Sequence, residues 1–241
     1  MVKRAFLLLA IVLLNACFSG EPDARVLFIG NSYTYYNDMP EMVSRLAESV
    51  DVDVEVDSVV EGGAWLRDHF RNGVASDKIA SGEFDYAVIQ EQSAVPSDPA
   101  LAREVMFPAA SGFAADAATV DTTLLLFETW GHLSGFADTG HGNYNSMQNA
   151  INSTYEELSE LLDQPLAPAG EAWQAALNAS SGIRLHQADK SHPTTEGSYL
   201  AALVITSAIT GVSPADMTFD AGLPVGVASL LRTYASQTTG Q

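Results

Sequence analysis

Short apolar runs in this chain alternate with longer segments in which apolar residues recur at helical spacing. The runs are typical of buried strands, and the longer segments are typical of helices. We expect strands at residues 26–29, 52–60, 86–90, 123–127 and 166–168. We expect helices at residues 40–50, 64–71, 99–118, 144–162, 171–178, 195–210 and 225–236.

This regular alternation begins at about residue 25 and continues towards the C-terminus. Alternating strands and helices produce a parallel sheet covered by helices on both faces. The predicted fold class is therefore α/β, as a three-layer α/β/α, flavodoxin-like arrangement with a central parallel sheet of about five strands. A chain of 241 residues fits one domain of this class, and it contains no repeat or low-complexity tract.

The N-terminal segment has a different pattern. Lys3 and Arg4 precede an apolar run at residues 5–14, which has the charge and order of a secretory signal and is too short to span a bilayer. The run ends in Leu14-Asn15-Ala16-Cys17, which resembles the bacterial lipobox, so Cys17 is expected to be lipidated. An ordinary signal peptide with an incidental cysteine is the alternative. We therefore expect a signal peptide at 1–16, a lipid-anchor tether at 17–24 and one domain at 25–241, held in the bacterial cell envelope.

The cysteine content and the net charge limit the kinds of chemistry and of partner that we expect. Cys17 is the only cysteine, which leaves the exported domain without an internal disulfide or thiol chemistry. The formal net charge of −19 becomes −21 when the signal is removed, since that segment carries two cations and no acid. Such a surface repels nucleic acid and anionic lipid headgroups, so no nucleic-acid partner is expected, and membrane contact is expected only through the lipid. The carboxylates are scattered along the chain, which favours a role in solubility.

Polar residues follow the predicted strands. In a parallel sheet the carboxyl ends of the strands meet at one edge, where ligands bind. The polar positions are Ser32 after the first strand, Gly62 and Gly63 after the second, residues 90–93 after the third, residues 128–132 after the fourth, and Asp189 with His192 before the helix at 195–210. We expect all of them on one rim.

Ser32, Asp189 and His192 are the residue types of a nucleophile, an orienting carboxylate and a general base. A serine hydroxyl needs an adjacent base, normally a histidine held by a carboxylate. The three-residue spacing lets Asp189 reach the imidazole Nδ1 while Nε2 faces the serine. The order Ser, Asp, His also occurs in α/β-hydrolases, but those use G-x-S-x-G, whereas residues 30–34 are Gly-Asn-Ser-Tyr-Thr.

From Arg25 to about Ala208 the sequence resembles the SGNH, or GDSL-like, hydrolase superfamily. The segment Phe28-Ile29-Gly30-Asn31-Ser32 matches the serine block, with Asn31 in place of the usual aspartate, and Asp189-Lys190-Ser191-His192-Pro193 matches the last block. The resemblance implies that Ser32 is the nucleophile, His192 the general base and Asp189 its orienter.

The resemblance also implies an oxyanion hole. Its donors would be the backbone N–H of Ser32, the N–H of Gly63 with Gly62 as the fallback, and an asparagine side chain after the third strand. This chain has no Gly-x-Asn-Asp there, and Gln92 stands where the asparagine would be. Gln92 offers the same amide donor on a side chain one methylene longer. A missing donor costs about 2.7–4 kcal/mol in other serine hydrolases.

A purely structural role is an alternative for several of these candidate residues. Ser32 and Thr34 could cap the first helix or cradle a phosphate. Gly62-Gly63 could be a plain turn and Gln92 a loop residue. Asn31, Trp65 and Trp130 are candidates for substrate binding, with His132 near the same rim, although core packing explains tryptophans equally well. The histidines lack metal-ligand spacing, and no nucleotide motif occurs, so neither a metal nor a cofactor is expected.

These features predict an exported lipoprotein serine esterase that hydrolyses O-acetyl or other short acyl esters, possibly on a polysaccharide. A lysophospholipase or lipase would use the same mechanism. The alternative from another class is a catalytically weak or inactive glycan-binding lipoprotein with the same fold. The sequence does not indicate acyl chain length, the alcohol or the oligomeric state.

Overall fold

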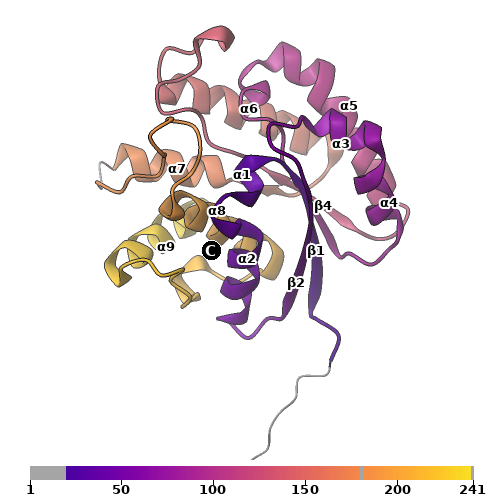
Figure 1. The fold of residues 1–241 in the computed structure, drawn as a ribbon, viewed down its shortest axis with the longest axis horizontal. Coiled ribbons are helices and arrows are strands. Elements are labelled where there is room, and N and C mark those ends of the chain that lie inside the picture. The colour runs from indigo at the N-terminus through magenta and orange to yellow at the C-terminus, as the bar shows by residue number, and fades with distance from the viewer. Residues whose placement is uncertain (1–19, 180–181, 240–241) are drawn as a thin grey trace, which may run out of the picture.

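The structure is a computed structural model that describes residues 20–179 and 182–239, and its centre is a five-stranded sheet (Figure 1). The order of strands is β2-β1-β3-β4-β5, and every neighbouring pair is parallel. The bounds are β1 Ala24–Gly30, β2 Val54–Val60, β3 Tyr86–Ile89, β4 Thr123–Phe127 and β5 Leu166–Ala167. The expected signal peptide and the lipidation site at Cys17 lie outside the described residues.

Helices cover both faces of the sheet because its strands are buried on both sides. Val26 and Phe28 of β1 point into one apolar core, and Leu27 and Ile29 point into the other. The first core is closed by α2 Met39–Glu48, α7 Ala169–Asn178, α8 Thr195–Thr210 and α9 Val225–Thr239. The second is closed by α3 Leu66–Asn72, α4 Val74–Ala80, α5 Pro99–Ala117 and α6 Tyr144–Leu162. The predicted three-layer α/β/α fold is confirmed (Figure 1).

The predicted elements correspond to observed ones with small shifts at their ends, and two α-helices of the described residues were not predicted. One is α4, which follows α3 directly, because Gly73 at φ +78° ends α3 and lets the chain turn into a new helix. This helix has only seven residues and buries Ala75 and Ile79. Its apolar pattern is therefore too short to be recognised in the sequence. The other is α1 Ser32–Tyr35, a single turn that opens the site described below.

The described residues were compared with the requirements of a membrane span and of a metal site. None of their helices combines the length and apolar character that crossing a bilayer requires. They also contain no group of three or more His, Cys, Asp or Glu side chains arranged to hold a metal ion.

Gly30 ends β1 where the backbone comes very close to two side chains. A Cβ at this position would lie 2.5 Å from Gln90 Oε1 and 2.5 Å from Thr34 Oγ1. Real Cβ atoms do not approach other atoms so closely, so any side chain here must displace the side chains of Gln90 and Thr34, which are hydrogen-bonded to each other. The glycine is therefore needed for packing at the junction between strand and turn.

We expect Gly30→Ala to lower the free energy of unfolding by about 1–3 kcal/mol, because overpacking of a buried junction forces backbone shifts. Urea denaturation followed by circular dichroism measures the change. The matched control is Gly226→Ala in α9, where an added Cβ meets nothing within 4 Å. Equal stability of Gly30→Ala and the control variant would contradict this account of the junction.

Candidate active site

The turn after β1 is held by its own cap and by one buried glutamine. Asn31 precedes α1, and its side-chain oxygen accepts a hydrogen bond from Tyr33 N at 3.1 Å. Gln90 Oε1, at the end of β3, accepts from Asn31 N at 2.9 Å and from Thr34 Oγ1 at 2.9 Å. Asn31 and Gln90 therefore fix the turn, and the Ser32 side chain is not used as a helix cap.

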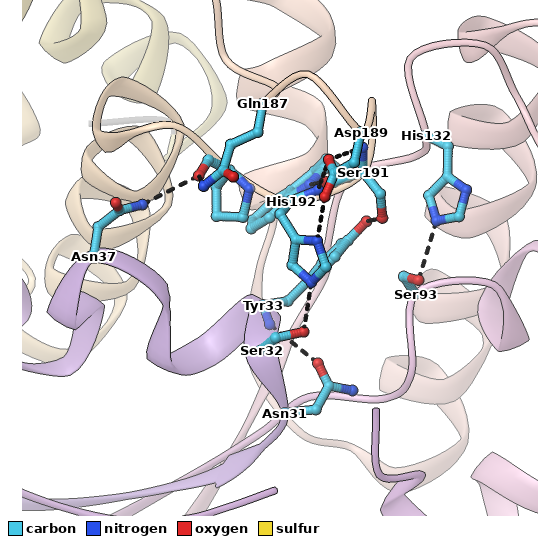
Figure 2. A network of polar contacts seen from close by, with 12 residues as sticks. Asn31, Ser32, Tyr33, Asn37, Ser93, His132, Gln187, Asp189, Ser191 and His192 are labelled. Carbon is cyan, nitrogen blue, oxygen red and sulfur yellow. Dashed lines mark hydrogen bonds and ion pairs between the residues drawn. The ribbon is translucent and has the colours of Figure 1, made fainter. Parts of the chain in front are cut away.

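Ser32, His192 and Asp189 form a continuous hydrogen-bonded series (Figure 2). Ser32 Oγ lies 2.9 Å from His192 Nε2, and His192 Nδ1 lies 2.6 Å from Asp189 Oδ2. A carboxylate can only accept a hydrogen bond, so Nδ1 carries the proton and Nε2 accepts from the serine. Ser32 and His192 are 160 positions apart in the chain, and together with Asp189 they meet at one edge of the sheet.

The other oxygen of Asp189 organises the loop that carries His192. Asp189 Oδ1 accepts hydrogen bonds from the backbone N–H groups of Ser191 and His192, both at 3.0 Å. Partial burial raises the pKa of the Asp189 carboxyl, but the bonds from Ser191 and His192 outweigh this and the pKa is lower than the ordinary value. The carboxylate therefore stays ionised in neutral solution and orients the imidazole.

Two amide side chains hold the same loop in place. Asn37 Nδ2 donates to the carbonyl oxygens of Pro193 at 3.2 Å and Thr194 at 3.1 Å, and to Ser198 Oγ at 2.8 Å. Gln187 Nε2 donates to Pro193 O at 2.9 Å. Sequence analysis did not identify Asn37 or Gln187, because their partners lie in another part of the chain or on the backbone.

Trp130 supports this loop from inside the protein and does not line the site, so its predicted role in substrate binding is wrong. It is fully buried, and its ring stacks between Tyr33, with centroids 4.5 Å apart, and Trp173, 4.0 Å apart. Its Nε1 donates to the carbonyl oxygen of Ser191 at 3.0 Å. Core packing, the alternative for this tryptophan, describes its position.

A groove of about 510 Å³ opens over the Ser32 hydroxyl. Tyr35 and Tyr36 stack on each other along its wall, with ring centroids 5.7 Å apart, and Tyr36 also stacks on the imidazole of His192 at 4.4 Å. The lining combines aromatic, polar and glycine residues: Asn31, Ser32, Tyr33, Tyr35, Tyr36, Gly62, Gly63, Gln92, Ser93, Ala94, His132, Phe136, Ser191 and His192.

The remaining substrate-binding candidates have structural contacts. Trp65 is not among the residues that line the groove, and the guanidinium of Arg67 lies 4.2 Å from its ring centroid. Asn31 does line the groove, but it is buried, and its Nδ2 donates to Ala64 O at 3.0 Å. The phenyl and phenol rings that line the groove therefore come from Tyr33, Tyr35, Tyr36 and Phe136, which the sequence did not single out.

Both glycines predicted after β2 lie at the groove. Ala64 N donates to Glu61 O at 3.1 Å, which closes a turn with Gly62 and Gly63 at its centre. Gly63 has φ +73°, a conformation that favours glycine, and it is exposed to the groove. The turn does not use the N–H of Gly63 to close itself.

The Gln92 side chain is folded onto its own loop. Its Oε1 accepts from Ala94 N at 2.9 Å, and its Nε2 donates to Ser93 Oγ at 3.4 Å. The amide nitrogen predicted to face the oxyanion is therefore held beside a second hydroxyl in the groove.

Two buried carboxyl groups lie beneath the site. Glu91 Oε1 accepts from Leu66 N at 3.1 Å and from Gln92 N at 2.6 Å, which joins the loops after β2 and β3. Burial raises the pKa of Glu91 to about 7, despite the opposing hydrogen bonds from Gln92 and Leu66. Burial also raises the pKa of Glu128 well above its usual value, and its Oε1 accepts from Glu171 N at 3.0 Å.

Comparisons of the fold show what this arrangement resembles. No protein-family model matches the chain, and no curated protein matches it. A solved DUF4886 family protein from Bacteroides uniformis is similar over 89% of this chain and 93% of its own, at 19% identity and a TM-score of 0.77. A putative SGNH hydrolase from Slackia heliotrinireducens matches 77% of this chain and 98% of its own, at 28% identity and a TM-score of 0.63.

A third solved structure is that of an acetyl xylan esterase from Geobacillus stearothermophilus. It matches 78% of this chain and 93% of its own, at 13% identity and a TM-score of 0.57. Together the fold and the site define an α/β/α protein with a Ser–His–Asp series at the carboxyl edge of a parallel sheet. The solved structures of similar fold include SGNH and GDSL-like hydrolases, which confirms the resemblance to this superfamily that the sequence predicted.

We expect Glu91→Gln to remove part of the pH dependence of stability. The pKa of Glu91 in the folded protein is about 7, above the ordinary value of 4.5. Its protonated form therefore stabilises the folded state below pH 4.5, and that contribution is lost as pH rises through 7. The glutamine has no charge to bury, so relative to wild type the variant should gain on the order of 3 kcal/mol between pH 4.5 and pH 8.

Urea denaturation of both proteins at a series of pH values measures this difference. Glu160→Gln, at an exposed position on α6, is the surface control. Parallel stability curves for wild type and Glu91→Gln would show that the carboxyl is not protonated in the folded protein.

Proposed function

We propose that this protein is a serine esterase in which Ser32 is the nucleophile, His192 the general base and Asp189 the residue that orients it. The observation that carries the proposal is the series Ser32–His192–Asp189, with 2.9 Å and 2.6 Å between its polar atoms, at the groove. Structural likeness to esterases and lipases supports ester hydrolysis as the general chemistry.

In the proposed reaction Ser32 Oγ attacks the ester carbonyl carbon while His192 Nε2 accepts the hydroxyl proton. Asp189 stabilises the imidazolium that forms. When the tetrahedral intermediate collapses, the imidazolium gives its proton to the departing alcohol and the acyl group remains on Ser32. Water then attacks the acyl-enzyme with His192 as base again, which releases the acid and restores the serine.

The negative oxygen of the tetrahedral intermediate needs donors already in position. The N–H of Ser32, at the first position of α1, cannot be used within that helix. The N–H of Gly63 belongs to the turn after β2, which also lines the groove. We propose these two groups as the backbone donors.

The groove suits a short acyl group attached to a polar alcohol. A long fatty acyl chain requires a continuous apolar channel, whereas here Gln92, Ser93, His132 and Ser191 are interspersed among the aromatic rings. Tyr35 is 41% exposed and continues the stacked tyrosine surface to the rim, where it could pack against a sugar face. An O-acetylated polysaccharide is our proposed substrate class, in line with the acetyl xylan esterase of similar fold.

We expect Ser32→Ala to reduce kcat for p-nitrophenyl acetate by at least 10³-fold, because the nucleophile is removed while the groove is kept. A fluorophosphonate should label wild type at Ser32 and fail to label the variant, as measured by mass spectrometry. Ser229→Ala, an exposed serine on α9, is the matched control and should keep full activity. Equal turnover by wild type and Ser32→Ala, or none across a broad ester panel, would favour a glycan-binding protein without catalysis.

We further propose that the protein is exported and anchored in the cell envelope through lipid on Cys17, with no membrane contact beyond that lipid. Two or three acyl chains carried by the lipid on Cys17 would hold it stably at a bilayer surface. Expression of Cys17→Ser should move the protein from the membrane fraction to the soluble fraction, and its mass should lack the acyl groups. Recovery of wild type in the soluble fraction without added mass would support cleavage as an ordinary signal peptide.

A further inference from the structure

We propose that the hydroxyl of Ser93 is the third donor to the oxyanion, and that His132 and Gln92 are positioning residues that aim it. This inference rests on the proposed esterase function and deepens it, because it assigns a role to a polar pair that the Ser32–His192–Asp189 series does not use. Ser93 follows β3 and His132 follows β4, and both line the groove that contains Ser32. Figure 2 shows the pair joined by a hydrogen bond to one side of Ser32.

The contacts of Ser93 determine where its proton can point. Ser93 is buried, with 7% of its surface exposed. Its Oγ lies 3.1 Å from His132 Nε2 and 3.4 Å from Gln92 Nε2. An amide nitrogen can only donate, so Gln92 uses one lone pair of the hydroxyl oxygen. With the Nε2–H tautomer, His132 uses the other. The hydroxyl proton of Ser93 is then left to donate. It can point to the nearby Tyr33 hydroxyl, which also pairs with Ser191 Oγ at 2.7 Å, or into the groove, and a negative oxygen in the groove favours the second direction.

The electrostatic state of His132 fits this arrangement. Burial lowers the pKa of His132, with a smaller opposite effect from Asp189, so its imidazole is neutral near pH 7. A neutral ring donates from Nε2 without placing a full positive charge in the groove. Donation from His132 to Ser93 also polarises the hydroxyl and strengthens the bond that it donates onward to a negative oxygen.

The loop that carries Ser93 is held before any substrate arrives. Glu91 accepts the Gln92 N–H at 2.6 Å, and Gln92 Oε1 accepts the Ala94 N–H at 2.9 Å. These bonds fix the backbone on both sides of Ser93. A preorganised donor needs no rearrangement when charge develops, which is what makes an oxyanion donor effective. They also keep the Gln92 amide beside Ser93, so the residue at the family's asparagine position supports the donor.

The first experiment measures kcat and KM for p-nitrophenyl acetate in Ser93→Ala. We expect kcat to fall about 10²–10³-fold with KM nearly unchanged, the effect of losing one oxyanion donor in other serine hydrolases. Ser93→Thr keeps the hydroxyl and should restore most of kcat. The matched control is Ser97→Ala, because Ser97 is also buried but donates to the carbonyl oxygen of Ala94 at 2.7 Å and does not line the groove. Its kcat should stay within threefold of wild type.

The second experiment tests whether the effect belongs to the tetrahedral state. A boronic acid that forms a tetrahedral adduct on Ser32 should bind Ser93→Ala more weakly by about the same factor as kcat falls. His132→Ala should lower kcat by about tenfold or more, His132→Gln should recover part of it through its amide donor, and adding His132→Ala to Ser93→Ala should cause no further loss. Thermal denaturation of each variant verifies that it is folded.

The outcomes separate this inference from the proposed function. If Ser93→Ala keeps kcat within threefold while Gln92→Ala loses 100-fold, Gln92 is the donor and the Ser93 inference is overturned, although the esterase stands. If Ser93→Ala and Ser97→Ala lose activity equally and Ser93→Thr gives no rescue, the effect is one of packing and the inference also fails. If wild type shows no Ser32-dependent turnover, both proposals fall together.

Discussion

The parallel pairing of β1 with β2 on one side and β3 on the other is the constraint on which the site depends. Parallel strands release their following loops at the same edge, whatever the distance along the chain. The serine turn, the Gly62-Gly63 turn and the Gln92 loop therefore meet at one groove. An antiparallel β2 or β3 would have carried its loop to the opposite end of the sheet, about 15–20 Å away for strands of this length.

The proposed nucleophile and the proposed base are held in different ways. Ser32 follows the buried strand β1, where Gln90 accepts hydrogen bonds from the backbone N–H of Asn31 and the hydroxyl of Thr34. His192 is on a loop before α8 and depends on contacts made by Asn37, Gln187 and Trp130. The precision of the Ser32–His192 contact thus arises from side chains that themselves carry no reacting atom, since a site is only as well placed as the residues around it.

Burying Glu91 and Glu128 has an energetic cost, because carboxyl groups removed from water resist ionisation. Glu91 joins two loops of the groove through hydrogen bonds to Leu66 and Gln92. Glu128 holds the start of α7 through the backbone of Gly170 and Glu171. In each case a buried carboxyl group accepts a backbone N–H from a distant segment, and the main-chain oxygen of Glu128 adds the bond from Gly170. The protein thus gives up some stability near neutral pH for a groove of defined shape.

The sequence by itself determined the alternation of strands and helices, the three-layer fold, and the pairing of a serine after the first strand with an Asp-x-x-His near the last long helix. These features are local: apolar periodicity sets each element, and residue type with spacing indicates the chemistry. Only the tertiary structure decided that Trp130 belongs to the core, that Tyr35 and Tyr36 form the groove wall, and that Gln92 turns toward Ser93. The reason is that burial and hydrogen-bond partners depend on residues far away in the chain, and a residue's own neighbours in sequence carry no record of them.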